Sequence, residues 1–137
     1  AALAARGRVV VVMQQVLVDG EIAHPGLTRL EVVPDMAQRK LRMEELADLF
    51  VALPGGSGTL EEFFEAWTWQ QLGIHTKPVA LYDVDGYWQP RLNMIDRMVG
   101  RGFRDARYRE SLIVARTPRE LLTAWDRWQA PQAKWGS

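Results

Sequence analysis

Apolar and polar positions alternate along the chain in segments that predict strands and helices in turn. Five short runs have the apolar or β-branched character of buried strands: "RVVVVM" (8–13), "TRLEVV" (28–33), "LFVALP" (49–54), "PVALYD" (78–83) and "SLIVA" (111–115). Helical periodicity follows over 35–50, over Leu60–Leu72 up to Gly73, from about Tyr87, and over Pro118–Trp128. This alternation predicts right-handed crossovers and a doubly wound parallel α/β sheet.

Length, charge and cysteine content narrow the class of protein. The 137 residues predict one α/β domain over 1–130 with a flexible tail over 131–137. Seventeen basic and seventeen acidic residues balance, so the chain has no basic stripe for nucleic acid, and no apolar run is long enough for a membrane span. The absence of cysteine is typical of a reducing compartment. We expect a soluble, cytoplasmic protein that binds neither nucleic acid nor membrane.

A glycine-rich turn in "VALPGGSGTLEEFFEAW" (51–67) is the main candidate for ligand binding. Gly55, Gly56 and Gly58 permit close approach of a ligand, and the turn ends at a helix N-terminus whose N–H groups point outward. A Walker loop is excluded because no lysine follows Gly58, and the dinucleotide fingerprint fails at Glu61, where its third glycine would stand. The turn therefore favours a single phosphate, and a ligand-free strand-to-helix turn is the alternative.

Glu61 and Glu62 follow this turn, and two interpretations compete. With Thr59 as N-cap, Glu62 completes the capping box T-x-x-E, and acidic residues favour a helix N-terminus. Taken alone, capping is the better explanation. A carboxylate near a bound phosphate would, however, be unfavourable unless it met positive charge on the ligand, as in a sugar that becomes an oxocarbenium ion.

Arg39 interrupts an apolar helix face. On a helical wheel through 36–50 it falls within the arc formed by Met36, Met43, Leu46, Ala47 and Phe50. A guanidinium group in that position must be paired, extend its stem across the apolar stripe or contact a ligand, and these alternatives stay open.

Histidine and tryptophan residues add less. His24 and His75 match no metal-ligand spacing and are predicted to be loop or surface residues, so we expect no metal site. Trp67 shares a helical arc with Leu60 and Phe63, which favours burial or a subunit interface over a stacking platform.

The segment "PGGSGTLEE" (54–62), preceded by "MAQRKLRMEELADLFVAL", resembles the LOG ("lonely guy") family. These cytokinin riboside 5′-monophosphate phosphoribohydrolases, long labelled lysine decarboxylases, share P-G-G-x-G-T-x-x-E and an upstream R-K pair. The resemblance continues through "WTWQQLGIHTKPVALYDVDGYW" and covers the chain from about Gly7 to the last helix. It implies a modified Rossmann fold, a homodimer and no cofactor.

The resemblance also implies roles for individual residues. Glu62 would be the catalytic glutamate and Arg39 its partner arginine, with Met36 and Lys40 as weaker substrate contacts. The 5′-phosphate would bind Gly55, Gly56, Ser57, Gly58 and Thr59. The implied reaction is hydrolysis of the N-glycosidic bond of a purine nucleoside 5′-monophosphate, either cytokinin-type or AMP, to free base and ribose 5-phosphate.

Two departures from the family pattern leave alternatives. The family's N-terminal strand and Gly/Ser-rich turn have no counterpart here, and Val11 and Gln14 stand where members usually have the glycine and proline of G-V-I-P. "AALAARG" is typical of the last turns of a helix ended by Gly7, so we expect either a fragment or a divergent protein.

The alternatives to the enzyme are a non-catalytic carrier of a phosphorylated nucleotide-like ligand, similar to molybdenum cofactor carriers, and an inactive dimer-forming remnant. Glu62 favours the enzyme, because a carrier needs no carboxylate beside its phosphate.

Overall fold

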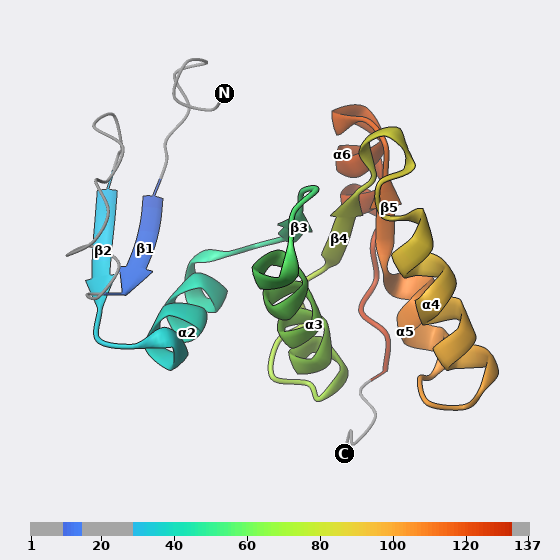
Figure 1. Cartoon of the computed structure of the whole chain (residues 1–137), viewed down its shortest axis with the longest axis horizontal. Helices are drawn as coiled ribbons and strands as arrows, with labels where there is room; N and C mark the ends of the chain where they lie inside the picture. Colours follow the sequence, from blue (N-terminus) through green and yellow to red (C-terminus); the bar gives the residue numbers. More distant parts are fainter. Residues whose placement is uncertain (1–9, 15–28, 133–137) are drawn as a thin grey trace. The chain divides into compact units, whose positions relative to one another are not determined.

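The structure is a computed structural model that describes residues 10–14 and 29–132 (Figure 1). The chain divides into two compact units, Ala1–Ala47 and Asp48–Ser137. The single domain expected over 1–130 therefore stays a prediction. The predictions for "AALAARG", for His24 and for 133–137 lie outside the described residues.

The first unit contains two parallel strands and one helix. β1 (Val10–Gln14) pairs with β2 (Arg29–Val33), so that Val10 lies opposite Arg29. α2 (Met36–Leu46) contacts both strands. Its predicted cap is confirmed, because the Asp35 side chain accepts a hydrogen bond from the Gln38 N–H at 2.9 Å.

The prediction of a helix up to Phe50 is wrong beyond Leu46. Ala47, the C-cap, has extended backbone dihedrals, and Phe50 begins the next strand. Phe50 therefore does not belong to the apolar arc that was drawn around Arg39. The overlap arose because a short apolar strand start cannot be told from a continuing helix by periodicity alone.

The second unit is a three-stranded parallel sheet with helices between its strands. Its strand order is β3 (Phe50–Ala52), β4 (Val79–Tyr82) and β5 (Ile113–Ala115). The helical connections are α3 (Ser57–Gln71) between β3 and β4, and η1 (Val84–Gly86), α4 (Gln89–Gly100) and α5 (Ala106–Ser111) between β4 and β5, with α6 (Pro118–Arg127) after β5 (Figure 1). The predicted parallel α/β architecture is confirmed.

Side chains alternate across this sheet and form a core on each face. Val79 and Leu81 of β4 join the larger core, which also contains Phe63, Ala66, Trp67, Trp88, Leu92, Ile95, Tyr108 and Leu112 from α3, α4, α5 and adjoining turns. On the opposite face Ala80 packs with Ile113 and Ala115 beneath α6. Full burial of a large apolar side chain contributes about 1.5–3 kcal/mol, so the alternation stabilises helices on both faces.

Trp67 is fully buried, with 0% of its surface exposed, as its helical arc predicted. Trp128 lies in the smaller core, and its indole N–H donates to the Ser111 carbonyl at 2.9 Å. At the start of the predicted tail, the Gln132 carbonyl accepts a hydrogen bond from the Tyr108 hydroxyl at 2.7 Å. Within the described part of the chain, no helix is both long and apolar enough to cross a bilayer.

α3 begins three residues earlier than predicted. Its N-cap is Gly56, which makes no side-chain capping bond, and Thr59 already lies in the first helical turn. The predicted capping box between Thr59 and Glu62 is therefore wrong. The C-terminal prediction is correct, because Gly73 adopts a φ of 77°, which favours glycine, just after the helix.

Candidate functional site

The glycine turn lies at the carboxyl end of β3, where ligands bind in open parallel α/β sheets. The first α-helical bond of α3 joins the Leu60 N–H to the Gly56 carbonyl at 3.2 Å. The N–H groups of Ser57, Gly58 and Thr59 precede it and therefore have no acceptor within the helix. Together with the helix dipole, they form an end that favours an anion.

The three glycines of the turn differ in why a side chain would be unfavourable at their positions. A Cβ atom placed on Gly56 or on Gly58 would meet no atom within 4 Å, so both positions face open space. At Gly55, a Cβ would lie 3.0 Å from the Thr59 Cβ and closer still to its hydroxyl oxygen. Gly55 is thus required by the fold, whereas Gly56 and Gly58 leave room for a ligand.

Glu62 lies on the same helix face as Gly58. The two residues are four positions apart on α3, which places their side-chain directions one above the other. Glu62 is half-buried, whereas Glu61 is exposed. The structure therefore groups Glu62 with the open positions of the turn, and Glu61 points to a different side of the helix.

A turn after β4 also contacts the glycine turn. The Tyr87 hydroxyl donates to the Gly55 carbonyl at 2.6 Å. Asp83, fully buried at the end of β4, accepts hydrogen bonds from the Trp88 N–H and from Nε2 of Gln89, both at 2.7 Å. Sequence reasoning missed these residues; the only signal was "DVDGYW", whose Asp-Gly pair after a strand indicates a tight turn.

Arg39, Met36 and Lys40 lie on α2, in the first unit. Met36 is 38% exposed, while Arg39 and Lys40 are half-buried, and no residue of α2 is fully buried. Arg39 and Glu62 belong to different units, and their pairing stays a prediction. Within the second unit, the predicted phosphate residues Gly55–Thr59 and Glu62 are brought together on one turn and one helix.

His75 lies in a loop, which confirms the prediction of a loop or surface residue, but its side chain is buried. It is only 5% exposed, and its ring lies 5.1 Å from the Phe50 ring. Its Nδ1 accepts the Lys77 N–H at 3.1 Å and its Nε2 lies 2.7 Å from the Ala66 carbonyl, so one neutral tautomer with the proton on Nε2 satisfies both. Among the described residues, no group of three His, Asp or Glu side chains is placed to hold a metal ion.

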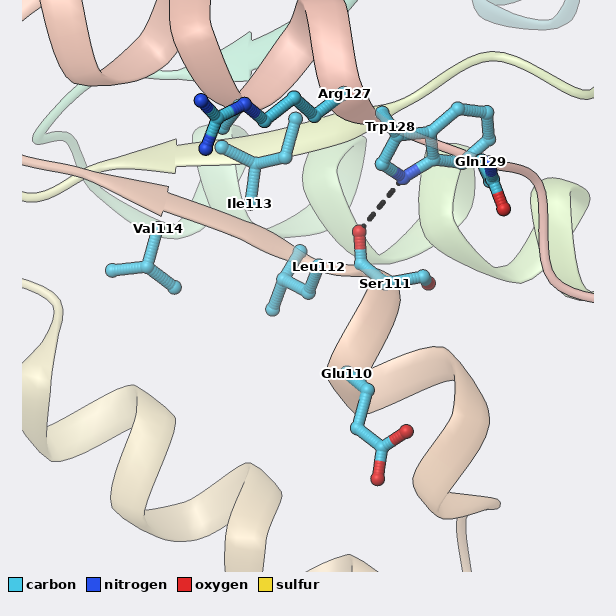
Figure 2. A pocket seen from close by; sticks show the side chains of 9 residues that line it. Glu110, Ser111, Leu112, Ile113, Val114, Arg127, Trp128 and Gln129 are labelled. Atoms are coloured by element: carbon cyan, nitrogen blue, oxygen red, sulfur yellow. Dashed lines mark hydrogen bonds between the residues drawn. The ribbon is translucent and has the colours of Figure 1, made fainter.

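A cavity of about 370 Å³ lies elsewhere in the second unit, around the start of β5 and the end of α6 (Figure 2). Figure 2 shows the Trp128–Ser111 hydrogen bond at its wall, with Glu110 and Arg127 nearby. This cavity adjoins the amino end of β5, whereas the glycine turn follows the carboxyl end of β3, and the strands are parallel. None of the predicted site residues lines it.

Comparison with known proteins defines the class. The family model described as "possible lysine decarboxylase" matches residues 1–125. The chain belongs to this family, the LOG family that its glycine motif resembles, and the recognition from sequence is confirmed.

Three similar proteins illustrate the relationship. The probable cytokinin riboside 5′-monophosphate phosphoribohydrolase LOGL2 of Oryza sativa subsp. japonica is 46% identical over 114 residues, 83% of this chain and 47% of that protein. The cytokinin riboside 5′-monophosphate phosphoribohydrolase LOG3 of Arabidopsis thaliana is 44% identical over 114 residues, 83% of this chain and 53% of that protein. The cytokinin riboside 5′-monophosphate phosphoribohydrolase of Rhodococcoides fascians is 50% identical over 96 residues, 70% of this chain and 48% of that protein. The chain thus spans about half the length of these relatives.

Proposed function

We propose that this protein hydrolyses the N-glycosidic bond of a purine nucleoside 5′-monophosphate and releases the free base and ribose 5-phosphate. The observation that carries this proposal is Glu62 on the same face of α3 as Gly58, one turn from the outward N–H groups. The names of the relatives, cytokinin riboside 5′-monophosphate phosphoribohydrolases, support the same reaction.

In the proposed complex, the 5′-phosphate binds the N–H groups at the start of α3, with Gly55, Gly56, Ser57, Gly58 and Thr59 around it. Backbone donors and the helix dipole suit an anion there, and the open positions at Gly56 and Gly58 allow close approach. The phosphate then holds the ribose at a constant distance from Glu62.

The reaction places positive charge on the ribosyl carbon as its bond to the base nitrogen breaks. The bond's electron pair leaves with the base, which takes up a proton, and a water oxygen bonds to the ribosyl carbon while the water gives up one proton, so that the reaction balances. We assign Glu62 the stabilisation of this charge or the orientation of the water, as carboxylates act in glycoside hydrolysis. Arg39 would contact phosphate, ribose or base, with Met36 and Lys40 as weaker substrate contacts.

The position of Glu62 strengthens this assignment. The competing explanation of its carboxylate was a capping box with Thr59, but Gly56 is the N-cap and Glu62 lies in the second helical turn. The carrier alternative is not favoured, because the relatives are named as enzymes. We also propose a homodimer and a cytoplasmic location, which the family resemblance and the cysteine-free sequence support.

The test is chromatographic. Purified protein is incubated with AMP and with N6-isopentenyladenosine 5′-monophosphate, and free base and ribose 5-phosphate are quantified. We expect Glu62→Gln to lower kcat/KM by about 100-fold or more, because the neutral amide cannot balance the developing charge. The neighbouring Glu61→Gln is the matched control and should stay within a few-fold of the wild type. The faster substrate decides between a cytokinin-type and a plain adenine base.

Two results would contradict the proposal. Equal turnover by the wild type and Glu62→Gln would remove Glu62 from the catalytic step. Nucleotide binding without any base release by the wild type would support the carrier instead.

A further inference from the structure

We propose that Tyr87 positions the phosphate-binding turn by fixing the orientation of the Gly55–Gly56 peptide. This inference rests on the proposed function and adds a positioning residue that lies outside the glycine motif. The Tyr87 hydroxyl donates to the Gly55 carbonyl at 2.6 Å, across 32 residues of sequence. It connects the turn after β4 to the turn after β3.

The Tyr87 side chain is not placed as a core residue would be. It is 51% exposed, whereas the adjacent Trp88 is buried at 2%, and the two rings meet edge to face at 5.0 Å. Core packing therefore does not account for a tyrosine at this position. Its short hydrogen bond to Gly55 is the contact that uses the hydroxyl group.

The orientation of one peptide decides whether the turn offers a donor or an acceptor. A trans peptide is planar, so its carbonyl oxygen and the N–H of the next residue point in opposite directions. The described residues include no cis peptide bond. The Tyr87 hydroxyl therefore holds the Gly55 oxygen on its own side, and the Gly56 N–H points to the other side.

This peptide joins two glycines, which makes the alternative orientation accessible. Glycine adopts positive and negative φ with similar ease, so the peptide between two of them turns over more readily than others. The turned-over peptide would present a carbonyl oxygen where the Gly56 N–H had pointed. A bound phosphate would then lose one hydrogen-bond donor and would also be repelled by the carbonyl oxygen, and both effects weaken binding.

Tyr87 itself lies in a turn whose conformation is fixed by hydrogen bonds to a buried side chain. The buried Asp83 carboxylate accepts hydrogen bonds from the Trp88 N–H and the Gln89 amide, on the two residues that follow Tyr87. Asp85 and Gly86 have φ values of 51° and 73°, an arrangement that reverses the chain just before Tyr87. Left-handed non-glycine residues persist only where their surroundings determine them. A continuous series of contacts, from Asp83 through the turn that contains Tyr87 to Gly55, thus supports the glycine turn.

The experiment compares two tyrosines that each lose only a hydroxyl group. Tyr87→Phe should weaken binding of inorganic phosphate and of AMP by about threefold to tenfold, the value of one hydrogen bond. It should raise KM for the nucleotide more than it lowers kcat. In NMR spectra, the Gly56 amide resonance of Tyr87→Phe should broaden, because the peptide now exchanges between two orientations.

Tyr108→Phe is the matched control. The Tyr108 hydroxyl donates to the carbonyls of Gln71 and Gln132, at 3.3 and 2.7 Å, at the opposite end of α3 from Gly55. This variant should lose stability but bind phosphate like the wild type. Loss of phosphate affinity in both variants, in proportion to stability, would overturn the positioning role, as would wild-type binding by Tyr87→Phe.

The outcomes separate this inference from the proposed function. If the wild type releases base and Tyr87→Phe is indistinguishable from it, only the positioning role falls. If the wild type binds neither phosphate nor AMP, the proposed function falls, and the positioning role falls with it.

Discussion

The guanidinium carbon of Arg104 lies 3.8 Å from the centroid of the Trp67 ring, over a tryptophan that is fully buried in α3. Arg104 also donates to Oε1 of Gln71 at 2.8 Å. Burial lowers the pKa of the Arg104 guanidinium, which still leaves it charged at neutral pH. One cation from the loop after α4 thus contacts the C-terminal half of α3 twice.

We predict that Arg104→Ala lowers the free energy of unfolding by about 1–2 kcal/mol, through loss of the cation–π contact and of one hydrogen bond. Urea denaturation followed by circular dichroism measures it. The exposed Arg101, substituted by Ala, is the control and should change stability by less than about 0.5 kcal/mol. Equal losses in the two variants would show that the Trp67 contact contributes nothing.

Gly58→Ala should separate stability from binding. The added methyl group meets no atom of the protein within 4 Å, and alanine in a helix stabilises by up to about 1 kcal/mol relative to glycine. The same methyl group occupies the space proposed for the phosphate, so AMP affinity should fall by about tenfold or more. Thermal unfolding and calorimetric titration measure the two effects.

Gly55→Ala is the contrasting variant. Its methyl group would collide with the Thr59 side chain, so it should lose about 1–3 kcal/mol of stability. The interpretation of the turn would be contradicted if Gly58→Ala bound AMP normally, or if Gly55→Ala were as stable as the wild type.

Lowering the pH should lower the free energy of unfolding of the first unit, because the Glu31 carboxylate becomes protonated. Hydrogen bonds from Arg42, with Nε and Nη2 at 2.8 and 2.9 Å, are the main cause that holds the pKa of Glu31 below its ordinary value of 4.5. A carboxyl group whose pKa is depressed on folding contributes stability above its unfolded pKa, and that contribution is lost as the pH falls through the folded pKa. We therefore predict that Glu31→Gln is less stable than the wild type at about pH 7, and that the difference shrinks as the pH falls below the ordinary pKa of 4.5.

Urea denaturation across that pH range measures this effect. The exposed Asp126, substituted by Asn, is the surface control and should change the free energy of unfolding by less than about 0.5 kcal/mol. A constant difference between Glu31→Gln and the wild type at every pH would exclude the Arg42 interaction as its cause.

The elements that could be predicted from sequence are those whose signals are local. β4 was predicted because its apolar residues form an uninterrupted run, and the caps at Asp35 and Gly73 because each residue type has one common role there. The position of the glycine turn between β3 and α3 was likewise predicted from adjacent residues, and the catalytic role of Glu62 stays a prediction.

The features that could not be predicted depend on contacts between distant residues. The start of α3 was misplaced because Thr59 and Glu62 match the capping box T-x-x-E, whereas in the fold the Thr59 side chain packs closely on Gly55 and Gly56 is the N-cap. The helix α5 has only six residues, too few to show a period, and is held by the buried Tyr108. The contact between Tyr87 and Gly55 spans 32 residues of sequence, so no local sequence pattern predicts it.

The C-terminal end of α3 is clamped from several sides. Nε2 of Gln70 donates to the Lys77 carbonyl at 2.9 Å, and Tyr108 and Arg104 both bond to Gln71. A helix secured at its far end cannot slide towards a ligand at its near end, so any adjustment on binding is confined to the few residues before it. The proposed phosphate site is then preorganised: the entropy of ordering the helix is lost once, during folding, and little more would be lost when the proposed nucleotide binds.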